Sequence, residues 1–160
     1  MTLDRRTLLA GTGAIALSGA FGLFPARAAR PNAPFKLSDA EWRKKLSPMA
    51  YAVLREAQTE RAFTSPLLNE HRKGKFDCAG CDLPLYDSST KFESGTGWPS
   101  FFRPLPKAIG TSSDEELGYV RTEVHCLRCG GHLGHVFDDG PKPTGLRYCM
   151  NGVALKFVPA

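Results

Sequence analysis

The sequence of 160 residues has no internal repeat and no stripe of basic residues interleaved with aromatic ones. The formal net charge is +5, but basic side chains are scattered among acidic ones, which indicates a solvated surface. We therefore expect no nucleic-acid partner. With 42% hydrophobic residues, the chain can bury the modest core of one domain.

A long, strongly apolar segment is also missing. The longest candidate is the run Leu8–Phe24, which is rich in alanine and glycine and lies at the lower length limit of a membrane span. A twin arginine precedes this run, and Ala26-Arg27-Ala28 supplies small residues before a cleavage position. The pattern predicts a twin-arginine signal peptide over residues 1–28 and a periplasmic protein. The alternative is an uncleaved segment that anchors the protein in the membrane.

The remaining chain is expected to form a linker and one folded domain. Residues 29–37 contain two prolines and are predicted to be the linker, so the domain would occupy 38–160. A capping-box pattern predicts a short helix over 38–46. A serine followed by proline predicts a second helix over 47–58.

From Lys75 onward, short segments rich in aromatic and β-branched residues are interrupted by glycine and proline. This pattern of short segments and breaks is typical of antiparallel strands joined by turns. Strands are predicted at 75–78, 118–126, 146–150 and 153–158. The expected fold is therefore mainly β, with short N-terminal helices forming a small cap.

The cysteine count is odd, and four of the five cysteines fall into two Cys-x-x-Cys pairs. Matched pairs with glycine nearby are typical of a four-thiolate zinc site, which is structural because no coordination position stays open. The predicted ligands are Cys78, Cys81, Cys126 and Cys129. One alternative is disulfide formation, since an exported protein meets an oxidising compartment. Another combines the second pair with His132 and His135 and leaves the first pair without a metal.

Cys149 is the one cysteine outside these pairs. It is either an inert residue of an apolar strand or a reactive thiol. The second interpretation is favoured by Arg147, which can stabilise a thiolate, and by the two imidazoles of His132 and His135, which can transfer protons.

Trp98 and the two remaining histidines are less specific indications of function. Trp98 lies in a glycine-containing loop and would either seal the core or form the wall of a pocket for a methyl or thioether group. No role follows for His71 or His125, which are expected at an exposed surface or in a turn.

Three segments resemble, in the same order, the methionine-R-sulfoxide reductases, the B type of peptide methionine sulfoxide reductase. They are SGTGWPSF at 94–101, GHLGHVFDDGP at 131–141 and LRYCMN at 146–151. With the helix start and both cysteine pairs, the resemblance covers nearly all of the expected domain. It implies two small antiparallel sheets in a β-tent-like arrangement and one structural zinc on the two cysteine pairs. The implied activity is reduction of the R epimer of methionine sulfoxide in oxidised proteins.

The resemblance also implies roles for individual residues. Cys149 would attack the sulfoxide sulfur as a thiolate and become a sulfenic acid. His132 and His135 would bind the sulfoxide oxygen and help to protonate it, since this oxygen is otherwise a poor leaving group. The remaining side chains would form the substrate pocket: Trp98, which would hold the methyl group, Arg147 and Asn151.

The chain departs from the commonest family pattern at Thr96, where many members carry a resolving cysteine. With four cysteines on zinc, no second thiol remains to form a disulfide with Cys149. We therefore expect a monomeric enzyme whose sulfenic acid is reduced by an external thiol, such as a thioredoxin-like protein. Two other functions stay open from the residues alone: a zinc-stabilised binding module that does not need Cys149, and a dithiol oxidoreductase that uses a Cys-x-x-Cys pair.

Overall fold

The structure, a computed structural model, describes residues 33–115 and 118–160. The predicted signal peptide at 1–28 and the first part of the predicted linker lie outside these residues. Across the described ranges, none of the helices has the length and apolar character needed to cross a membrane.

The described residues form mainly short strands, with η marking a short 3-10 turn. In chain order, the elements are α1 (Asp39–Lys45), α2 (Pro48–Glu56), η1 (Pro66–Asn69), β1 (Gly74–Cys78), β2 (Pro84–Asp87), η2 (Ser88–Thr90), β3 (Lys91–Phe92), β4 (Ser100–Phe101), β5 (Ile109–Asp114), β6 (Arg121–Cys126), β7 (His132–Phe137), β8 (Arg147–Met150), η3 (Gly152–Ala154) and β9 (Leu155–Pro159).

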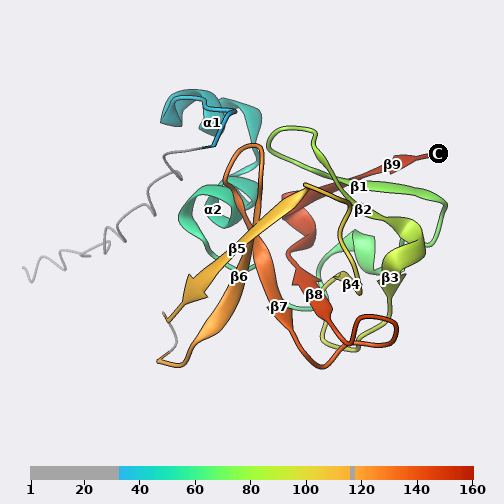
Figure 1. The fold of residues 1–160 in the computed structure, drawn as a ribbon. Coiled ribbons are helices and arrows are strands. Elements are labelled where there is room, and N and C mark those ends of the chain that lie inside the picture. Colours follow the sequence, from blue (N-terminus) through green and yellow to red (C-terminus); the bar gives the residue numbers. More distant parts are fainter. Residues whose placement is uncertain (1–32, 116–117) are drawn as a thin grey trace, which may run out of the picture.

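The strands form two antiparallel sheets, as expected. One sheet has the strand order β2-β1-β9, and the other has the order β3-β4-β8-β7-β6-β5. Figure 1 shows α1 and α2 beside the β5–β7 end of the larger sheet, while the C-terminal end of β9 lies on the opposite side of the molecule. The prediction of a mainly β fold with two antiparallel sheets and short N-terminal helices is confirmed.

Both helices begin where the sequence predicts. The Ser38 hydroxyl accepts a hydrogen bond from the Glu41 N–H, and the Glu41 carboxylate accepts one from the Ser38 N–H, which completes the capping box. The helix α2 starts at Pro48 after a Ser47 cap and ends at Glu56, followed by the C-cap Ala57, whose backbone is left-handed. Its buried side chains pack on β7 and η3.

The strand predictions need three corrections. Five strands, β2, β3, β4, β5 and β7, were not predicted. The strand predicted from Gly118 begins only at Arg121, because Gly118 has a φ of 79° and belongs to a turn. The strand predicted from Val153 begins at Leu155, since a 3-10 turn occupies the preceding residues.

His125 is also placed differently from the expectation. His71 is exposed, but His125 is buried on β6 with 8% of its surface accessible. The physical reason is Gly110, its partner on β5: a Cβ at that position would lie 2.4 Å from His125 Nε2. The absence of a side chain at Gly110 therefore makes room for the imidazole.

Three buried aromatic rings join the two sheets. Phe76 of β1 and Tyr86 of β2 are partners in the smaller sheet, and both contact Phe101 of β4 in the larger one. The ring centroids of Tyr86 and Phe101 are 4.3 Å apart in a stacked arrangement, and those of Phe76 and Phe101 are 4.9 Å apart in an edge-to-face arrangement. This contact holds the larger sheet against the smaller one.

We predict that Phe101→Ala lowers the free energy of unfolding by about 3–5 kcal/mol, because it opens a cavity at this junction. Urea unfolding of the metal-loaded protein measures the loss. The neighbouring Phe102 is only half-buried, so Phe102→Ala is a matched control that should lose clearly less. Equal losses in the two variants would contradict a junction centred on Phe101.

Candidate functional site

The four cysteines of the Cys-x-x-Cys pairs converge in one buried cluster. All four sulfur atoms lie within 4.8 Å of one another. The Sγ atoms of Cys78 and Cys129 are 3.7 Å apart, and those of Cys81 and Cys126 are 3.5 Å apart. A tetrahedral zinc ion with Zn–S bonds of about 2.3 Å would separate the sulfurs by about 3.8 Å. The cluster therefore has the size that a tetrahedral metal ion requires.

The two cysteine turns have the same backbone geometry. In each turn, the carbonyl of the first cysteine accepts a hydrogen bond from the residue four positions later, Asp82 or Gly130. Its N–H donates to the carbonyl five positions later. Asp82 and Gly130 both have positive φ values, 60° and 69°. Matched turns of this kind bring both thiols of each pair to the same side of the chain.

The chemistry of the cluster also fits a metal. Four thiolates gathered in one buried cluster would repel one another, so they need a cation to balance their charge. Two guanidinium groups add positive charge around the cluster: Arg55 donates to the Cys129 carbonyl and Arg128 to the Cys81 carbonyl. All five cysteines are free thiols, and neither histidine joins the cluster. The alternatives of disulfides and of a mixed cysteine–histidine site are wrong.

Cys149 lies at the wall of a separate cavity of about 120 Å³. This is space for a few water-sized groups. The residues that line it are Thr59, Trp98, Arg121, Gly134, His135, Phe137, Cys149 and Asn151. The pairing of β7 with β8 places His135 opposite Cys149. The strands approach closely at Gly134, where a Cβ would lie 2.1 Å from the Cys149 carbonyl oxygen.

His135 is held by a buried carboxylate. Its Nε2 lies 2.6 Å from Asp114 Oδ2, and Asp114 also accepts a hydrogen bond of 2.7 Å from Arg121. A carboxylate paired with arginine can only accept, so Nε2 carries the proton and Nδ1 keeps a lone pair. Burial lowers the pKa of His135 and outweighs the hydrogen bond with Asp114, which raises it. The ring is therefore neutral at pH 7 and can accept a proton.

His132 is held in the same way but lies deeper. Its Nδ1 is 2.9 Å from Glu123 Oε1, and the other Glu123 oxygen accepts a hydrogen bond from Ser112. Within the described residues, His132 Nε2 is buried and has no hydrogen-bond partner. The centroids of the His132 and His135 rings are 5.3 Å apart. His132 does not line the cavity and can reach a substrate only through a neighbouring group or water.

Trp98 and Asn151 meet at one residue, Glu60. The Trp98 indole Nε1 donates to the Glu60 carbonyl at 3.2 Å, and the Glu60 N–H donates to Asn151 Oδ1 at 2.9 Å. The Glu60 carboxylate is buried and accepts hydrogen bonds from the Gly152 and Val153 N–H groups at the start of η3. One acidic residue thus connects two walls of the cavity.

Arg147 lies beside the cavity and not in its lining. It forms two hydrogen bonds of 2.8 Å to the Asp139 carboxylate and stacks over the Phe137 ring, 4.4 Å from its centroid. The hydrogen bonds to Asp139 are the main reason that the pKa of Arg147 is raised, and attraction to Cys149 contributes less. The guanidinium therefore stays charged behind the aromatic wall that Phe137 provides.

The structure brings most of the predicted site residues together. Cys149, His135, Trp98 and Asn151 share one cavity, whereas His132 and Arg147 lie behind it. Sequence reasoning missed the residues that hold them in place: Asp114, Glu123, Asp139 and Glu60, together with Arg121 in the lining. Of these residues, only Asp139 lies in a segment that resembles the family, 131–141. No pattern in the sequence pointed to the others.

Comparison with known proteins identifies the family. A family model described as the SelR domain matches residues 46–159. The chain is 56% identical over 123 residues to the peptide methionine sulfoxide reductase MsrB of Agrobacterium fabrum, covering 76% of this chain and 91% of the relative. It is 52% identical over 121 residues to the chloroplastic peptide methionine sulfoxide reductase B1 of Arabidopsis thaliana, covering 75% and 60%. The chain therefore belongs to the SelR-domain family, the MsrB-type peptide methionine sulfoxide reductases that its motifs resemble.

Proposed function

We propose that this chain reduces the R epimer of methionine sulfoxide in oxidised proteins and peptides, with Cys149 as the nucleophile. Reduction of methionine sulfoxide follows from the family, since the relatives are peptide methionine sulfoxide reductases. The observation that carries the proposal is the pairing of Cys149 with a neutral His135 across one small cavity.

The proposed reaction needs one proton, and the Cys149 thiol holds it. His135 Nδ1 accepts this proton, the thiolate attacks the sulfoxide sulfur, and the imidazolium returns the proton to the sulfoxide oxygen. The S–O bond of the substrate breaks as its protonated oxygen passes to the Cys149 sulfur. The sulfur–sulfur bond formed in the attack breaks with its electron pair left on methionine, so methionine is reduced by two electrons and Cys149 is oxidised to a sulfenic acid. Two external thiols then restore Cys149, release water and become a disulfide. A thioredoxin-like protein is the proposed donor.

The shape of the cavity supports selection of one epimer. The sulfoxide sulfur carries a methyl group, an oxygen and the rest of the methionine, and each would face a different surface. The Trp98 indole offers an aromatic face for the methyl group, His135 faces the oxygen, and Cys149 approaches the sulfur. Three such contacts would leave one direction for the rest of the methionine, so the two epimers would direct their chains differently.

Zinc is the proposed metal of the cysteine cluster. Four thiolates in tetrahedral geometry are the ligand set of structural zinc sites, and the cluster holds no position for a substrate. When bound, zinc supplies charge balance and crosslinks two parts of the chain. Because all four paired thiols are buried, a dithiol oxidoreductase is disfavoured. Export through the twin-arginine route to the periplasm stays a prediction, as does the monomeric state.

We predict that Cys149→Ser lowers turnover by about a thousandfold or more, because a hydroxyl is a far weaker nucleophile than a thiol. The assay uses dithiothreitol and a peptide that carries both methionine sulfoxide epimers, which are separated by chromatography. Wild-type protein should consume the R epimer alone. Equal consumption of both epimers would contradict the proposed selection, and full activity of the variant would exclude Cys149 as the nucleophile.

Metal removal should unfold the protein. Structural zinc contributes about 10–16 kcal/mol in small zinc peptides, comparable with the whole stability of a domain at about 5–15 kcal/mol. We expect a chelator, or the substitution Cys81→Ser, to abolish cooperative thermal unfolding monitored by circular dichroism. Cys149→Ser is the matched cysteine control and should retain one zinc per chain by atomic absorption. Chelation that leaves the transition unchanged would refute a structural metal.

The stability of the protein should depend on His135 in mildly acidic solution. Since burial lowers its pKa in the folded state, the unfolded chain binds a proton more readily. The contribution of this ring is fully present above pH about 6.5 and is lost as the pH falls toward its folded-state pKa. We expect His135→Gln to flatten the fall in unfolding free energy below pH 6.5, by up to about 1.4 kcal/mol per pH unit. His71→Gln, at an exposed histidine, should leave the slope unchanged.

A further inference from the structure

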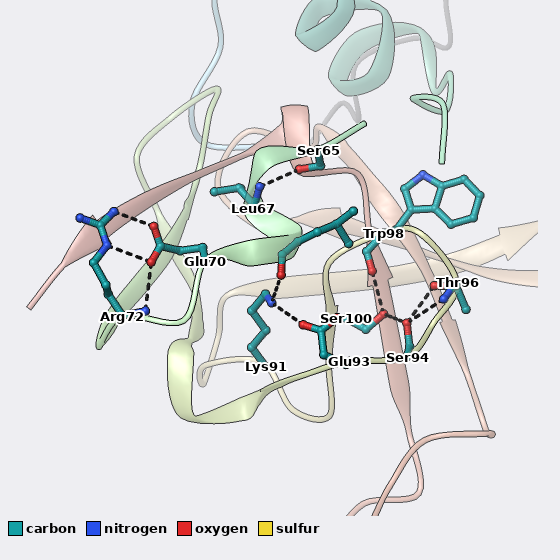
Figure 2. Close-up of polar contacts among 11 residues, drawn as sticks. Ser65, Leu67, Glu70, Arg72, Lys91, Glu93, Ser94, Thr96, Trp98 and Ser100 are labelled. Carbon is teal, nitrogen blue, oxygen red and sulfur yellow. Dashed lines mark hydrogen bonds and ion pairs between the residues drawn. The ribbon is translucent and has the colours of Figure 1, made fainter. Parts of the chain in front are cut away.

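A line of three hydroxyl groups ends at the sulfur of Cys149. Thr96 Oγ1 lies 3.7 Å from Cys149 Sγ, and 2.9 Å from Ser94 Oγ on its other side. Ser94 Oγ is 2.7 Å from Ser100 Oγ, and the Ser100 hydroxyl donates to the Trp98 carbonyl at 3.1 Å. Figure 2 shows the three hydroxyl groups meeting below the Trp98 indole. Ser94 and Thr96 lie in the loop that joins β3 to β4, and Ser100 is the first residue of β4.

The surrounding structure holds this line in position. Ser100 is 1% exposed and is the strand partner of Cys149 in the pairing of β4 with β8. At the start of the loop, the Lys91 amino group donates to the Leu68 carbonyl and to the Glu93 carboxylate, as Figure 2 also shows. The hydroxyl line is therefore a fixed part of the sheet edge and not a set of freely rotating surface groups.

Counting protons gives the direction of each hydrogen bond. Every hydroxyl and the thiol has one proton, and the Trp98 carbonyl can only accept. With a neutral thiol, all four contacts are satisfied in one way: Cys149 donates to Thr96, Thr96 to Ser94, Ser94 to Ser100, and Ser100 to the carbonyl. With a thiolate, three protons remain. Thr96 then donates to the sulfur, and one of the other three contacts is left without a proton.

The same count excludes a proton relay through the line. A carbonyl at its far end cannot take up a proton, so hydroxyl groups can rotate there but cannot carry a proton away. The thiol proton must leave through the cavity, where His135 and Arg121 are the ionisable groups of the lining besides Cys149 itself. Arg147 on β8 supplies a further positive charge nearby. The hydroxyl line thus acts on the sulfur by hydrogen bonding alone.

We propose that Thr96 is a catalytic residue that accepts a hydrogen bond from the Cys149 thiol and donates one to the thiolate, with Ser94 and Ser100 as positioning residues that hold the Thr96 hydroxyl beside the sulfur. The inference rests on the proposed function for its catalytic meaning. The hydrogen bonds themselves involve only the Cys149 sulfur and do not depend on that function. Thr96 occupies the place of a resolving cysteine and would therefore assist formation of the nucleophile without taking part in its oxidation.

The test measures the rate at which iodoacetamide alkylates Cys149 between pH 5 and 10 in zinc-loaded protein, where zinc protects the other four cysteines. This reaction reports the thiolate and needs no methionine sulfoxide. We expect Thr96→Val, which keeps the shape but removes the hydroxyl, to react about tenfold more slowly at pH 7 because a charge-assisted hydrogen bond is lost. The variant should regain the wild-type rate at high pH. Thr96→Ser restores the hydroxyl and should follow the wild-type profile.

The companion variant Ser94→Ala keeps the Thr96 hydroxyl but interrupts the line, so its profile should fall between those of wild type and Thr96→Val. Identical pH profiles for wild type, Thr96→Val and Ser94→Ala would overturn the inference. A wild-type protein that shows the expected alkylation series but no reductase activity would instead refute the proposed function and leave the hydrogen-bond assignment standing. A uniform loss at every pH would indicate blocked access to the sulfur and also count against the proposal.

Discussion

Four buried thiols hold the turn after β1 against the turn between β6 and β7, and much of the site is positioned by this contact. The first turn belongs to the smaller sheet and the second to the larger one, so the cluster crosslinks segments that are far apart in sequence. Closing such a long loop is costly in chain entropy, which a bound metal can offset. His132 follows the second turn directly as the first residue of β7. A cluster whose cysteines do not line the cavity of Cys149 therefore sets where the histidine strand begins.

The next constraint is the burial of two carboxylates beside that strand. A buried carboxylate is unfavourable unless hydrogen bonds and opposite charges satisfy it. Asp114 meets this requirement through Arg121 and His135, and Glu123 through Ser112 and His132. Each histidine therefore has one nitrogen committed to a carboxylate. The spacing of the histidines after a cysteine pair allowed a role as metal ligands, but within the described residues the candidate metal cluster consists of the four cysteines alone.

The sequence predicted the features that depend on local spacing. The two cysteine turns and both helix starts involve residues within a few positions of one another, so their geometry follows from the pattern. Cys149 stood out because it was the cysteine without a partner. The short strands β3 and β4 could not be predicted, since each has two residues: β4 exists only because β8 pairs with it, and β3 only because β4 does. The acidic residues that hold the histidines could not be predicted either. Asp114 contacts His135 although they are 21 positions apart in the sequence, and a single acidic residue forms no periodic pattern.

Glu60 illustrates best what a sequence pattern cannot contain. Its side chain is 3% exposed, and its backbone and carboxylate reach Trp98, Asn151 and the start of η3. Burial raises the pKa of Glu60 more than the hydrogen bonds from Gly152 and Val153 lower it. The ionised form is thus less favoured in the folded protein than in the unfolded chain, and its contribution to stability is lost as the pH rises through the raised pKa.

At neutral pH, the fold therefore retains a buried acid that works against its own stability. Such local conflicts are expected where a site needs a particular geometry. An apolar residue in place of Glu60 would leave the N–H groups of Gly152 and Val153 without an acceptor, directly after the strand that carries Cys149. The acid is best understood as the element that joins three separate segments into one pocket. The loss of stability from burying Glu60 is physically reasonable. In the described contacts of their side chains, Trp98 and Asn151 share no other hydrogen-bond partner.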